Sequence, residues 1–501
     1  MIEDFERCYV ALQSRDPRFD GWFYTAVTST HIYCRPSCLA QTPMRKNVRF
    51  YGSAAAAQLA GFRACKRCRP DASPGSPEWN SRADIASRAM RLIADGVVDR
   101  EGVPGLAAQL GYSVRQLERT LQSEIGAGPI AIARAQRAQT ARILIETTPL
   151  PMTDVAFAAG FSSVRQFNDT VQSVFATSPT RLRSRVRRPV REREASTAID
   201  LRLPFRQPLC PDNLFGHLAA TAVPGVEEVR NQTYRRTLRL AHGPGIVELT
   251  PMPDYINCRA VLSDMRDLTA TIARSRWLLD LDADPVAIDR QLRLDDALAP
   301  LVTKSPGRRV PRCVDGPEMA LRAILGQHIS TAAARTHAGR LTAQHGETIN
   351  DPGGGLNRLF PLPEALRDVE LAMPLKRRAS FNGLVTALAS GRLVLGPGSD
   401  RVEALDVLTS LTGIGPWTKH VIAMRALGDP DAFPETDLGV RRAAERLGLP
   451  VTPAALVERS QPWRPWRSYA VQYLWSVDDH RINHWPPRPR PLPNRKQEMS
   501  P

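Results

Sequence analysis

The sequence predicts a multidomain, mainly α-helical protein in which two regions with β-strands alternate with longer helical regions. Three observations support this prediction. The chain has 501 residues, enough for three or four domains of about 100–200 residues. Four of its eight cysteines fall in one aromatic-rich segment near the N-terminus. Residues 80–185 and 290–480 have helical periodicity, whereas residues 198–288 alternate short apolar segments with Gly and Pro turns.

Segments rich in Pro, Gly or Arg divide the chain. We expect linkers at residues 71–77 and 181–193, and a disordered Pro- and Arg-rich tail at 486–501. The predicted domains are a small α+β domain at 1–75, a helical domain at 80–187, an α+β domain with an antiparallel sheet at 198–289, and an all-α domain at 290–485.

The composition is that of a globular protein, with 43% hydrophobic and 24% charged residues. No apolar run reaches the roughly 18 residues of a membrane helix, and the acidic N-terminus carries no secretory signal. We therefore expect a cytoplasmic protein with no membrane partner. The net charge of +16 favours a polyanionic partner such as nucleic acid.

The clustered cysteines form two close pairs, Cys34 with Cys38 and Cys65 with Cys68. A cytosolic chain keeps its thiols reduced, so such pairs favour metal binding over disulfides. Two close pairs separated by a loop can place four sulfur atoms tetrahedrally around one Zn²⁺. The pattern therefore predicts a zinc site, with a redox pair or disulfides as the alternatives. The four scattered cysteines are expected to be buried small hydrophobes.

Residues 80–185 contain an approximate repeat at a spacing of about 50 residues. Each copy has a short apolar helix, a turn at Gly111 or Gly160, a Ser N-cap at Ser113 or Ser162, and an amphipathic second helix. This pattern predicts two helix-turn-helix units; a plain helical hairpin with a solvated face is the alternative. The second helices are expected to present side chains that read base edges: Arg115, Gln116 and Arg119 in the first copy, and Arg165, Gln166 and Asn168 in the second.

A glycine turn with a downstream aspartate stands near the C-terminus. Gly413 and Gly415 lie ahead of a helix, and two glycines in a tight turn expose backbone N–H groups that suit a phosphate. Asp437 follows about 20 residues beyond the turn, at the start of another helix. An isolated aspartate in that position would be interpreted as a helix cap.

Longer matches connect these motifs to known families. The cysteine segments 32–38 and 61–71 resemble the N-terminal zinc domain of the Ada methylation-response family, and residues 80–185 resemble the AraC-type DNA-binding region that follows it there. From about residue 198 the chain resembles AlkA-type 3-methyladenine DNA glycosylases of the helix-hairpin-helix superfamily. That resemblance rests on residues 323–330, 411–418 and 465–470 and on Asp437. The whole chain thus resembles a natural fusion of an Ada-type regulatory half with an AlkA-type glycosylase.

The Ada resemblance implies that Cys34 accepts a methyl group from a DNA methylphosphotriester in a stoichiometric transfer. A zinc-bound thiolate stays deprotonated at neutral pH and therefore remains nucleophilic. Four thiolates on Zn²⁺ carry a formal charge of −2 and methylation of one leaves −1, so the affinity for DNA is expected to rise. The methylated protein would then bind promoter DNA in the nucleoid and activate transcription of the adaptive response, with RNA polymerase as the expected partner.

The AlkA resemblance implies excision of N-alkylated purines such as 3-methyladenine from double-stranded DNA, by hydrolysis of the N-glycosidic bond. Asp437 would stabilise the oxocarbenium-like sugar or orient the attacking water. Trp417 and Trp466 would stack on the cationic base, with core packing as the alternative for both. Related strand-cutting enzymes have a lysine where Trp417 stands, and Lys419 is expected to face away, so a monofunctional glycosylase is predicted. The remaining expected DNA contacts are Gln327, His328, Gly413 and Gly415.

Three departures from these families matter. No Pro-Cys-His-Arg motif occurs, so O6-methylguanine repair is not predicted. His328 replaces the leucine that wedges into DNA in AlkA, and Val421 replaces a pocket tyrosine. Two other functions stay open: a DNA-binding transcription regulator whose glycosylase half is inactive, and a zinc-based thiol redox sensor.

Overall fold

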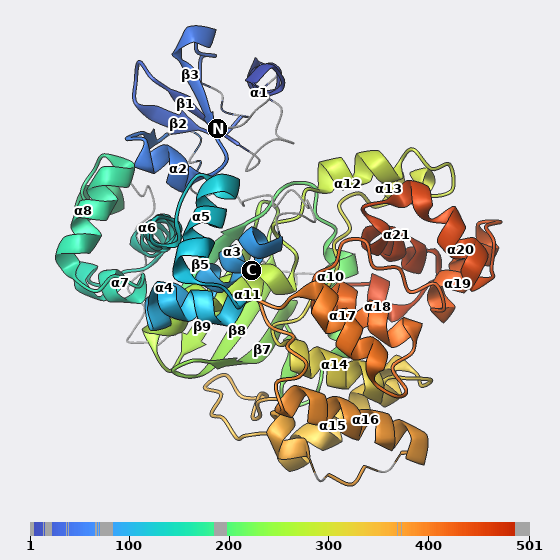
Figure 1. Cartoon of the computed structure of the whole chain (residues 1–501). Coiled ribbons are helices and arrows are strands. Elements are labelled where there is room, and N and C mark those ends of the chain that lie inside the picture. The colour runs from blue at the N-terminus through green and yellow to red at the C-terminus, as the bar shows by residue number, and fades with distance from the viewer. Residues whose placement is uncertain are drawn as a thin grey trace, which may run out of the picture.

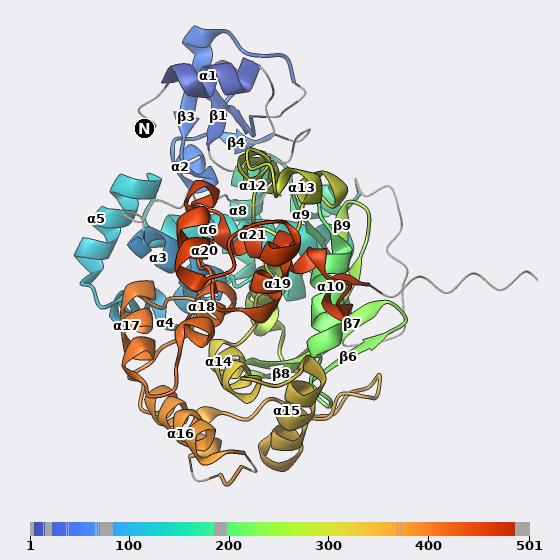
Figure 2. The same ribbon diagram turned by 90° about the vertical axis from the view of Figure 1, so that its right-hand side faces the viewer.

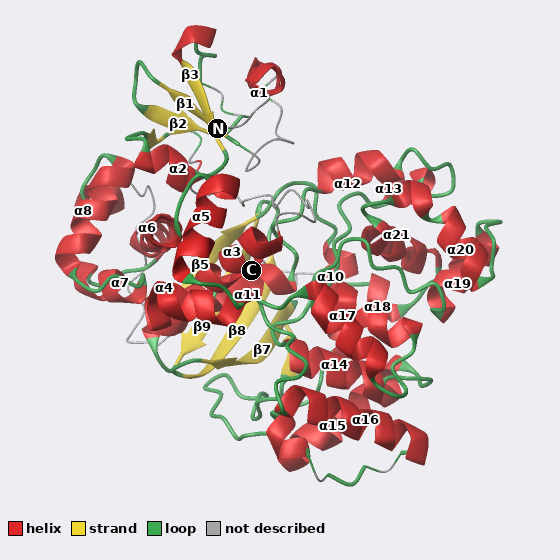
Figure 3. Cartoon of the chain, in the orientation of Figure 1, coloured by secondary structure: helices red, strands yellow, loops and turns green. Residues whose placement is uncertain are grey.

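Figure 1 shows the computed structural model of the chain, which is mainly helical, and Figure 3 marks the two sheets among the helices. The structure describes residues 5–13, 15, 23–36, 38, 40–65, 68, 70, 84–184, 198–367, 369–371 and 373–485. The predicted linker at 71–77, residues 185–193 of the basic run and the predicted tail at 486–501 lie outside these ranges. The predicted multidomain, mainly α-helical fold class is confirmed. Across the described ranges, no helix combines the length and apolarity needed to cross a bilayer.

The N-terminal region is built on a four-stranded sheet of order β3-β1-β2-β4. Its elements are α1 (Phe5–Gln13), β1 (Tyr24–Val27), β2 (Ile32–Cys34), β3 (Val48–Tyr51), α2 (Ala54–Leu59) and β4 (Arg63–Ala64). Strand β1 is antiparallel to β2 and β3, whereas β4 pairs parallel with β2. Because parallel strands end at the same edge of a sheet, Cys34 at the end of β2 and Cys65 just after β4 come to one edge.

Seven helices form the next region. They are α3 (Asp84–Ala94), α4 (Val97–Leu110), α5 (Val114–Ile125), α6 (Pro129–Thr147), α7 (Met152–Ala158), α8 (Val164–Phe175) and α9 (Pro179–Ser184). Both predicted helix pairs are present, α4 with α5 and α7 with α8, and the long α6 joins them. Gly111 and Gly160 take the left-handed conformation that each turn needs, with φ of 77° and 84°. The helix-turn-helix prediction is confirmed.

Two details of this region differ from the sequence prediction. The N-cap of α8 is Ser163 and not Ser162, because Ser163 has extended backbone angles and its hydroxyl accepts the N–H of Gln166. Ser162 instead forms a hydrogen bond of 3.1 Å with the side-chain oxygen of Gln166. The predicted linker at 181–193 also starts too early, since Arg181 and Arg183 still belong to α9.

A five-stranded antiparallel sheet of order β5-β9-β8-β7-β6 follows. Its elements are β5 (Ala198–Pro204), α10 (Pro211–Thr221), β6 (Glu227–Arg230), β7 (Thr233–Leu240), β8 (Gly243–Pro251), β9 (Tyr255–Leu262) and α11 (Leu268–Leu278). Every second residue of β9 is buried, which is the period expected of a strand with one covered face. The predicted α+β region with an antiparallel sheet is confirmed.

The C-terminal region is helical, as predicted. Its helices are α12 (Pro285–Leu292), α13 (Ala299–Lys304), α14 (Gly316–Leu325), α15 (Thr331–His345), α16 (Leu375–Ala389), α17 (Arg401–Ser410), α18 (Pro416–Arg425), α19 (Leu438–Arg446), α20 (Pro453–Arg459) and α21 (Arg467–Leu474). Helices α14–α17 share one apolar core, and α12, α13 and α19–α21 share another. Helix α18 contributes side chains to both cores, with Ile422 in the first core and Met424 in the second. Helix α18 therefore stands where the two cores meet, and the turn before it packs on the first core.

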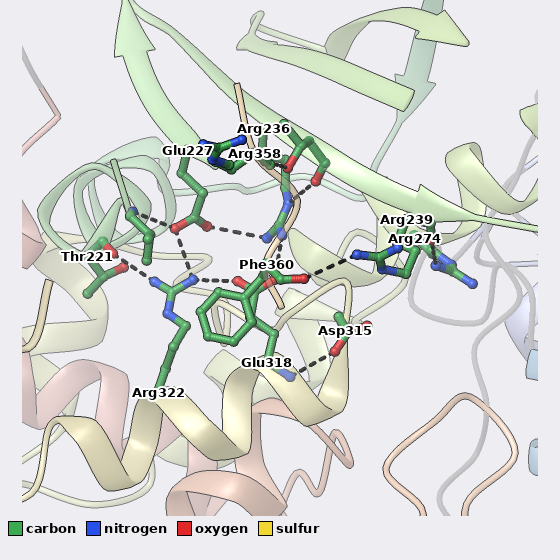
Figure 4. Close-up of polar contacts among 12 residues, drawn as sticks. Thr221, Glu227, Arg236, Arg239, Arg274, Asp315, Glu318, Arg322, Arg358 and Phe360 are labelled. Atoms are coloured by element: carbon green, nitrogen blue, oxygen red, sulfur yellow. Dashed lines mark hydrogen bonds and ion pairs between the residues drawn. The ribbon is translucent and has the colours of Figure 1, made fainter. Parts of the chain in front are cut away.

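A buried network of charges joins the five-stranded sheet to α14 (Figure 4). Arg236 on β7 donates to Glu227 at 3.3 Å and to Glu318 at 2.8 Å. Arg322 on α14 donates to the same two carboxylates, at 2.9 and 2.7 Å. Burial by itself would raise the pKa of Glu227, but Arg322 and Arg236 hold that pKa below its ordinary value. Loss of one member of such a network costs about 3–5 kcal/mol, so these contacts hold the sheet on α14.

Helix α3 connects the helix-turn-helix region to both later regions. Arg88 donates to the Asp400 carboxylate at 3.0 Å and to the Gly398 carbonyl at 2.7 Å, just ahead of α17. Asp95, which directly follows α3, accepts two hydrogen bonds from Arg274 on α11, at 2.9 and 3.2 Å. The N-terminal and C-terminal halves of the chain are therefore in direct polar contact.

Candidate functional site

The four clustered cysteines come together at one edge of the small sheet. Their Sγ atoms all lie within 4.8 Å of one another, and all four side chains are buried. The N–H of Cys38 donates to the carbonyl of Arg35 at 3.1 Å, which closes a tight turn after Cys34. The N–H of Cys65 donates to the carbonyl of Tyr33 at 2.9 Å, which extends the parallel pairing of β2 and β4 up to the cluster. The backbone thus brings both predicted pairs together.

The geometry of the cluster fits zinc. Tetrahedral Zn²⁺ with Zn–S bonds of about 2.3 Å places its sulfur ligands about 3.8 Å apart. The backbone N–H of Ala40 donates to Sγ of Cys38 at 3.5 Å, a contact that orients a thiolate ligand. Hydrogen bonds with the other thiols, first with Cys38, and burial raise the pKa of Cys34. A divalent cation bound among the four sulfur atoms would offset the unfavourable burial of their thiolate forms.

The predicted DNA-reading side chains lie on the outer faces of α5 and α8. Leu117 and Leu121 bury the inner face of α5, and Phe167 and Val171 bury that of α8. All six predicted residues are exposed: Arg115, Gln116, Arg119, Arg165, Gln166 and Asn168. This is the arrangement that entry of a helix into the major groove requires, and the individual base contacts stay a prediction.

The predicted glycine turn lies between α17 and α18. Gly413 has φ of 80°, and a Cβ there would lie 1.7 Å from Oγ of Ser380 on α16, so the position requires glycine. Gly415 is exposed, and nothing lies within 4 Å of a Cβ added to it. Gln327 lies in the turn between α14 and α15. Its Nε2 donates to the Gly413 carbonyl at 3.1 Å and to Oγ1 of Thr418 at 2.8 Å, so it joins that turn to the glycine turn. The two turns form one continuous edge.

Three N–H donors hold the carboxylate of Asp437. The residue is the N-cap of α19, and its Oδ1 accepts the backbone N–H of Val440 at 2.9 Å. Nε1 of Trp417 donates to Oδ2 at 2.7 Å, and Nε1 of Trp475 donates to Oδ1 at 2.9 Å. Asp437 is therefore a helix cap, as the simpler interpretation had it, but capping does not require the two indole donors. They orient the half-buried carboxylate between two aromatic rings.

Trp475 is a site residue that sequence motifs did not reveal. It follows α21 directly and begins a 3₁₀ turn, Trp475–Val477. Gly439 leaves room for it, because a Cβ there would lie 3.0 Å from Cδ1 of Trp475. The ring of His217 on α10 is stacked on Trp475 at a centroid distance of 6.3 Å. Burial, helped by two nearby arginines, lowers the pKa of His217 well below its ordinary value, so this ring is neutral at pH 7.

The other predicted residues of this region have diverse surroundings. Trp466 is half-buried and its ring meets Tyr469 edge-on at 5.8 Å, so its stacking on a base stays a prediction. His328 is exposed in the turn between α14 and α15, with φ of 59°, a left-handed conformation uncommon for a residue other than glycine. Val421 is buried in the core shared by α14–α17. Lys419 is half-buried on α18, and its orientation away from the base stays a prediction.

Family models match three parts of the chain. The metal binding domain of Ada matches residues 7–71, a helix-turn-helix domain matches residues 106–185, and the AlkA N-terminal domain matches residues 200–315. The first two ranges contain the cysteine cluster and both predicted reading helices, and the third contains the five-stranded sheet except for the first two residues of β5.

Three curated relatives cover different shares of the chain. The probable bifunctional transcriptional activator/DNA repair enzyme AlkA of Mycobacterium tuberculosis is 59% identical over 492 residues, which are 97% of this chain and 99% of that protein. The DNA-3-methyladenine glycosylase 2 of Escherichia coli is 32% identical over 277 residues, 53% of this chain and 93% of that protein. The bifunctional transcriptional activator/DNA repair enzyme Ada of Escherichia coli is 34% identical over 161 residues, 32% of this chain and 44% of that protein.

Proposed function

Because the chain belongs to the same family as the bifunctional transcriptional activator/DNA repair enzyme AlkA, we propose that it carries out two separate reactions on alkylated DNA. Its function combines DNA repair with transcriptional regulation, and DNA is its partner. The proposed reactions are the transfer of a methyl group from a DNA methylphosphotriester to Cys34 and the hydrolytic release of N-alkylated purines such as 3-methyladenine. The four-sulfur cluster supports the first reaction, and the carboxylate of Asp437 between two indole donors supports the second.

The methyl transfer uses the cysteine cluster, in which we propose one Zn²⁺ held by Cys34, Cys38, Cys65 and Cys68. A bound zinc ion would keep these thiols deprotonated at neutral pH. Sγ of Cys34 attacks the methyl carbon of the phosphotriester: an S–C bond forms, the C–O bond breaks, and the phosphodiester leaves as an anion. A thioether has no easy route back, so each chain accepts one methyl group. With Zn²⁺ bound, the formal negative charge of the centre would drop from two units to about one, which would weaken its repulsion from the DNA backbone.

The second reaction uses Asp437. An N-alkylated purine is already cationic, so it leaves readily once its nucleotide has been extruded from the duplex. The carboxylate of Asp437 would stabilise the positive sugar that forms as the C–N bond breaks, and would orient the water that attacks it. Trp417 and Trp475 flank the carboxylate, and their electron-rich faces suit a cationic base. The contact with Asp437 favours Trp475 over Trp466 as the second stacking residue.

The decisive experiment is release of free 3-methyladenine from methylated duplex DNA by the purified chain. We expect release by the wild type, no release by Asp437→Asn, and an intact abasic site as the other product. Borohydride should trap no covalent adduct, because Trp417 stands where a nucleophilic lysine would be needed. An adduct that disappears in Lys419→Ala would refute the monofunctional mechanism. A wild-type chain that releases no base would be a transcription regulator with an inactive glycosylase half.

For regulation, we propose that α5 and α8 bind promoter DNA in the nucleoid, with RNA polymerase as the protein partner. The exposed polar faces of both helices support this role. Transcription in vitro with purified RNA polymerase would test it, with methylated and unmodified protein compared on the same promoter. Activation after treatment with methylated DNA, and none after treatment with peroxide, is expected. Activation after treatment with peroxide, and none after treatment with methylated DNA, would identify a thiol redox sensor.

A further inference from the structure

The surface next to the His328 turn has a charge pattern that the proposed function does not yet use. Helices α15 and α16 together carry five Lys or Arg residues and no Asp or Glu. Within the described part of the chain, none of these five side chains forms an ion pair or a hydrogen bond. Figures 1 and 2 both place α15 and α16 at the same end of the molecule, below α14. The five residues, here called the α15–α16 basic face, are Arg335, Arg340, Lys376, Arg377 and Arg378.

The basic face borders the edge formed by the two turns. On one side, Ser380 lies under Gly413, and its hydroxyl donates to the carbonyl of Lys376 at 3.0 Å. The first turn of α16, with its three cations, is therefore within one helical turn of the glycine turn. On the other side, Arg335 is in the second turn of α15, about 6 Å along the helix axis from its first residue, Thr331. Four of the five cations thus lie in the first two turns of helices that begin beside the edge with the glycine turn and His328.

We propose that the α15–α16 basic face binds phosphates of the duplex on both sides of the damaged nucleotide. The inference rests on the proposed glycosylase function, because extrusion of a nucleotide requires that the flanking backbone be held in place. Contacts with phosphates set the position of a protein on DNA without reading its sequence, which suits an enzyme that finds damage anywhere. Cations without protein partners lose no ion pair when they contact phosphate. Neither helix carries an acidic residue that would oppose this attraction.

Single-turnover excision by the full chain at varied DNA concentration tests this proposal. The half-saturating DNA concentration reports productive binding by the glycosylase half, and the maximal rate reports chemistry. The variant Lys376→Gln/Arg377→Gln removes two charges from the basic face. Its matched control, Arg290→Gln/Arg293→Gln, removes two charges from exposed positions, one on α12 and one at its C-cap.

We expect the α16 double variant to raise the half-saturating concentration about tenfold or more near physiological salt, with the maximal rate unchanged. The slope of log affinity against log salt should fall by about 0.9 for each phosphate that the variant no longer neutralises, hence by about 2. The control should behave as the wild type. Arg335→Gln/Arg340→Gln should repeat the effect from the other helix, which separates it from a local folding defect on α16.

The proposal would be overturned if the α15 and α16 variants both had the same half-saturating DNA concentration and the same salt slope as the control. So would a lower maximal rate with unchanged half-saturation, since that result places the residues in the chemistry. If the wild type excises no base, the proposed function fails. The basic face is then tested by binding of the same variants to a duplex with a central tetrahydrofuran abasic analogue, to which the helix-turn-helix region contributes equally in every variant. Equal affinities of the basic-face variants and the control for this duplex would also refute the proposal.

Discussion

Replacement of Gly439 by alanine tests the Asp437 site without altering the carboxylate or either indole. A Cβ at this position would lie 3.0 Å from Cδ1 of Trp475, 3.1 Å from Oδ1 of Asp437 and 3.2 Å from Nε1 of Trp475. These separations are tighter than ordinary van der Waals contact, so the indole or the carboxylate must move by a few tenths of an ångström. The hydrogen bond of 2.9 Å between them then weakens. A hydrogen bond to a charged group contributes about 1.5–3 kcal/mol, so excision should slow about ten- to hundredfold.

The assay is single-turnover release of 3-methyladenine at saturating protein. Gly383→Ala on α16 is the matched control, since nothing lies within 4 Å of its new Cβ. Alanine should stabilise either helix by up to about 1 kcal/mol, so thermal melting should reveal no loss of fold. Methyl transfer to Cys34 should be unchanged in both variants. A Gly439→Ala chain that excises base at the wild-type rate would refute the inference that the position of Trp475 controls the site.

Three further predictions follow from the zinc centre and the buried network. Cys34→Ala should abolish methyl uptake and leave excision intact, as read by mass spectrometry and base release; a methyl group on Cys68 of the wild type would contradict the assignment. Methylated protein should bind its promoter more tightly than unmodified protein, and the gap should shrink with salt because exposed charges are screened over about 8–10 Å; equal affinities at low salt would exclude the electrostatic explanation. Glu227→Gln should reduce the free energy of unfolding by about 3–5 kcal/mol at pH 7, measured in urea, because Arg236 and Arg322 lose a buried counter-charge. Since the folded pKa of Glu227 lies below its ordinary value of 4.5, its contribution in the wild type is complete above that pH and is lost as the pH falls through the lowered pKa. The variant should lack this acid dependence, and a variant with the wild-type profile would disprove the role of the network.

Features encoded by neighbouring residues could be predicted from the sequence. The cysteine pairs are close in the chain, so their spacing already favours metal-ligand geometry, and the structure brings the four sulfur atoms within 4.8 Å of one another. The helix-turn-helix units depend on a period of 3.6 residues and on glycines with positive φ, both of which are local. The sequence predicts the N-cap of α8 at Ser162, one residue before the observed cap at Ser163, because two adjacent serines offer equal capping chemistry. Only the backbone angles of the folded chain distinguish them.

The partners of Asp437 could not be predicted in the same way. The sequence predicts the carboxylate of Asp437 and, 20 residues before it, Trp417, but Trp475 lies 38 residues beyond Asp437 and outside the recognised motifs. The motif at 465–470, which carried the resemblance, indicated Trp466 instead. Local patterns specify which residues form a helix and which face is apolar. They do not specify which indole meets the N-terminus of another helix, because that depends on how α19 and α21 pack and on the space that Gly439 leaves. The sequence by itself therefore predicted the order of helical and sheet regions, the cysteine cluster and the aspartate, whereas the tertiary structure decided which aromatic rings surround that aspartate, since only non-local packing brings them within hydrogen-bond distance.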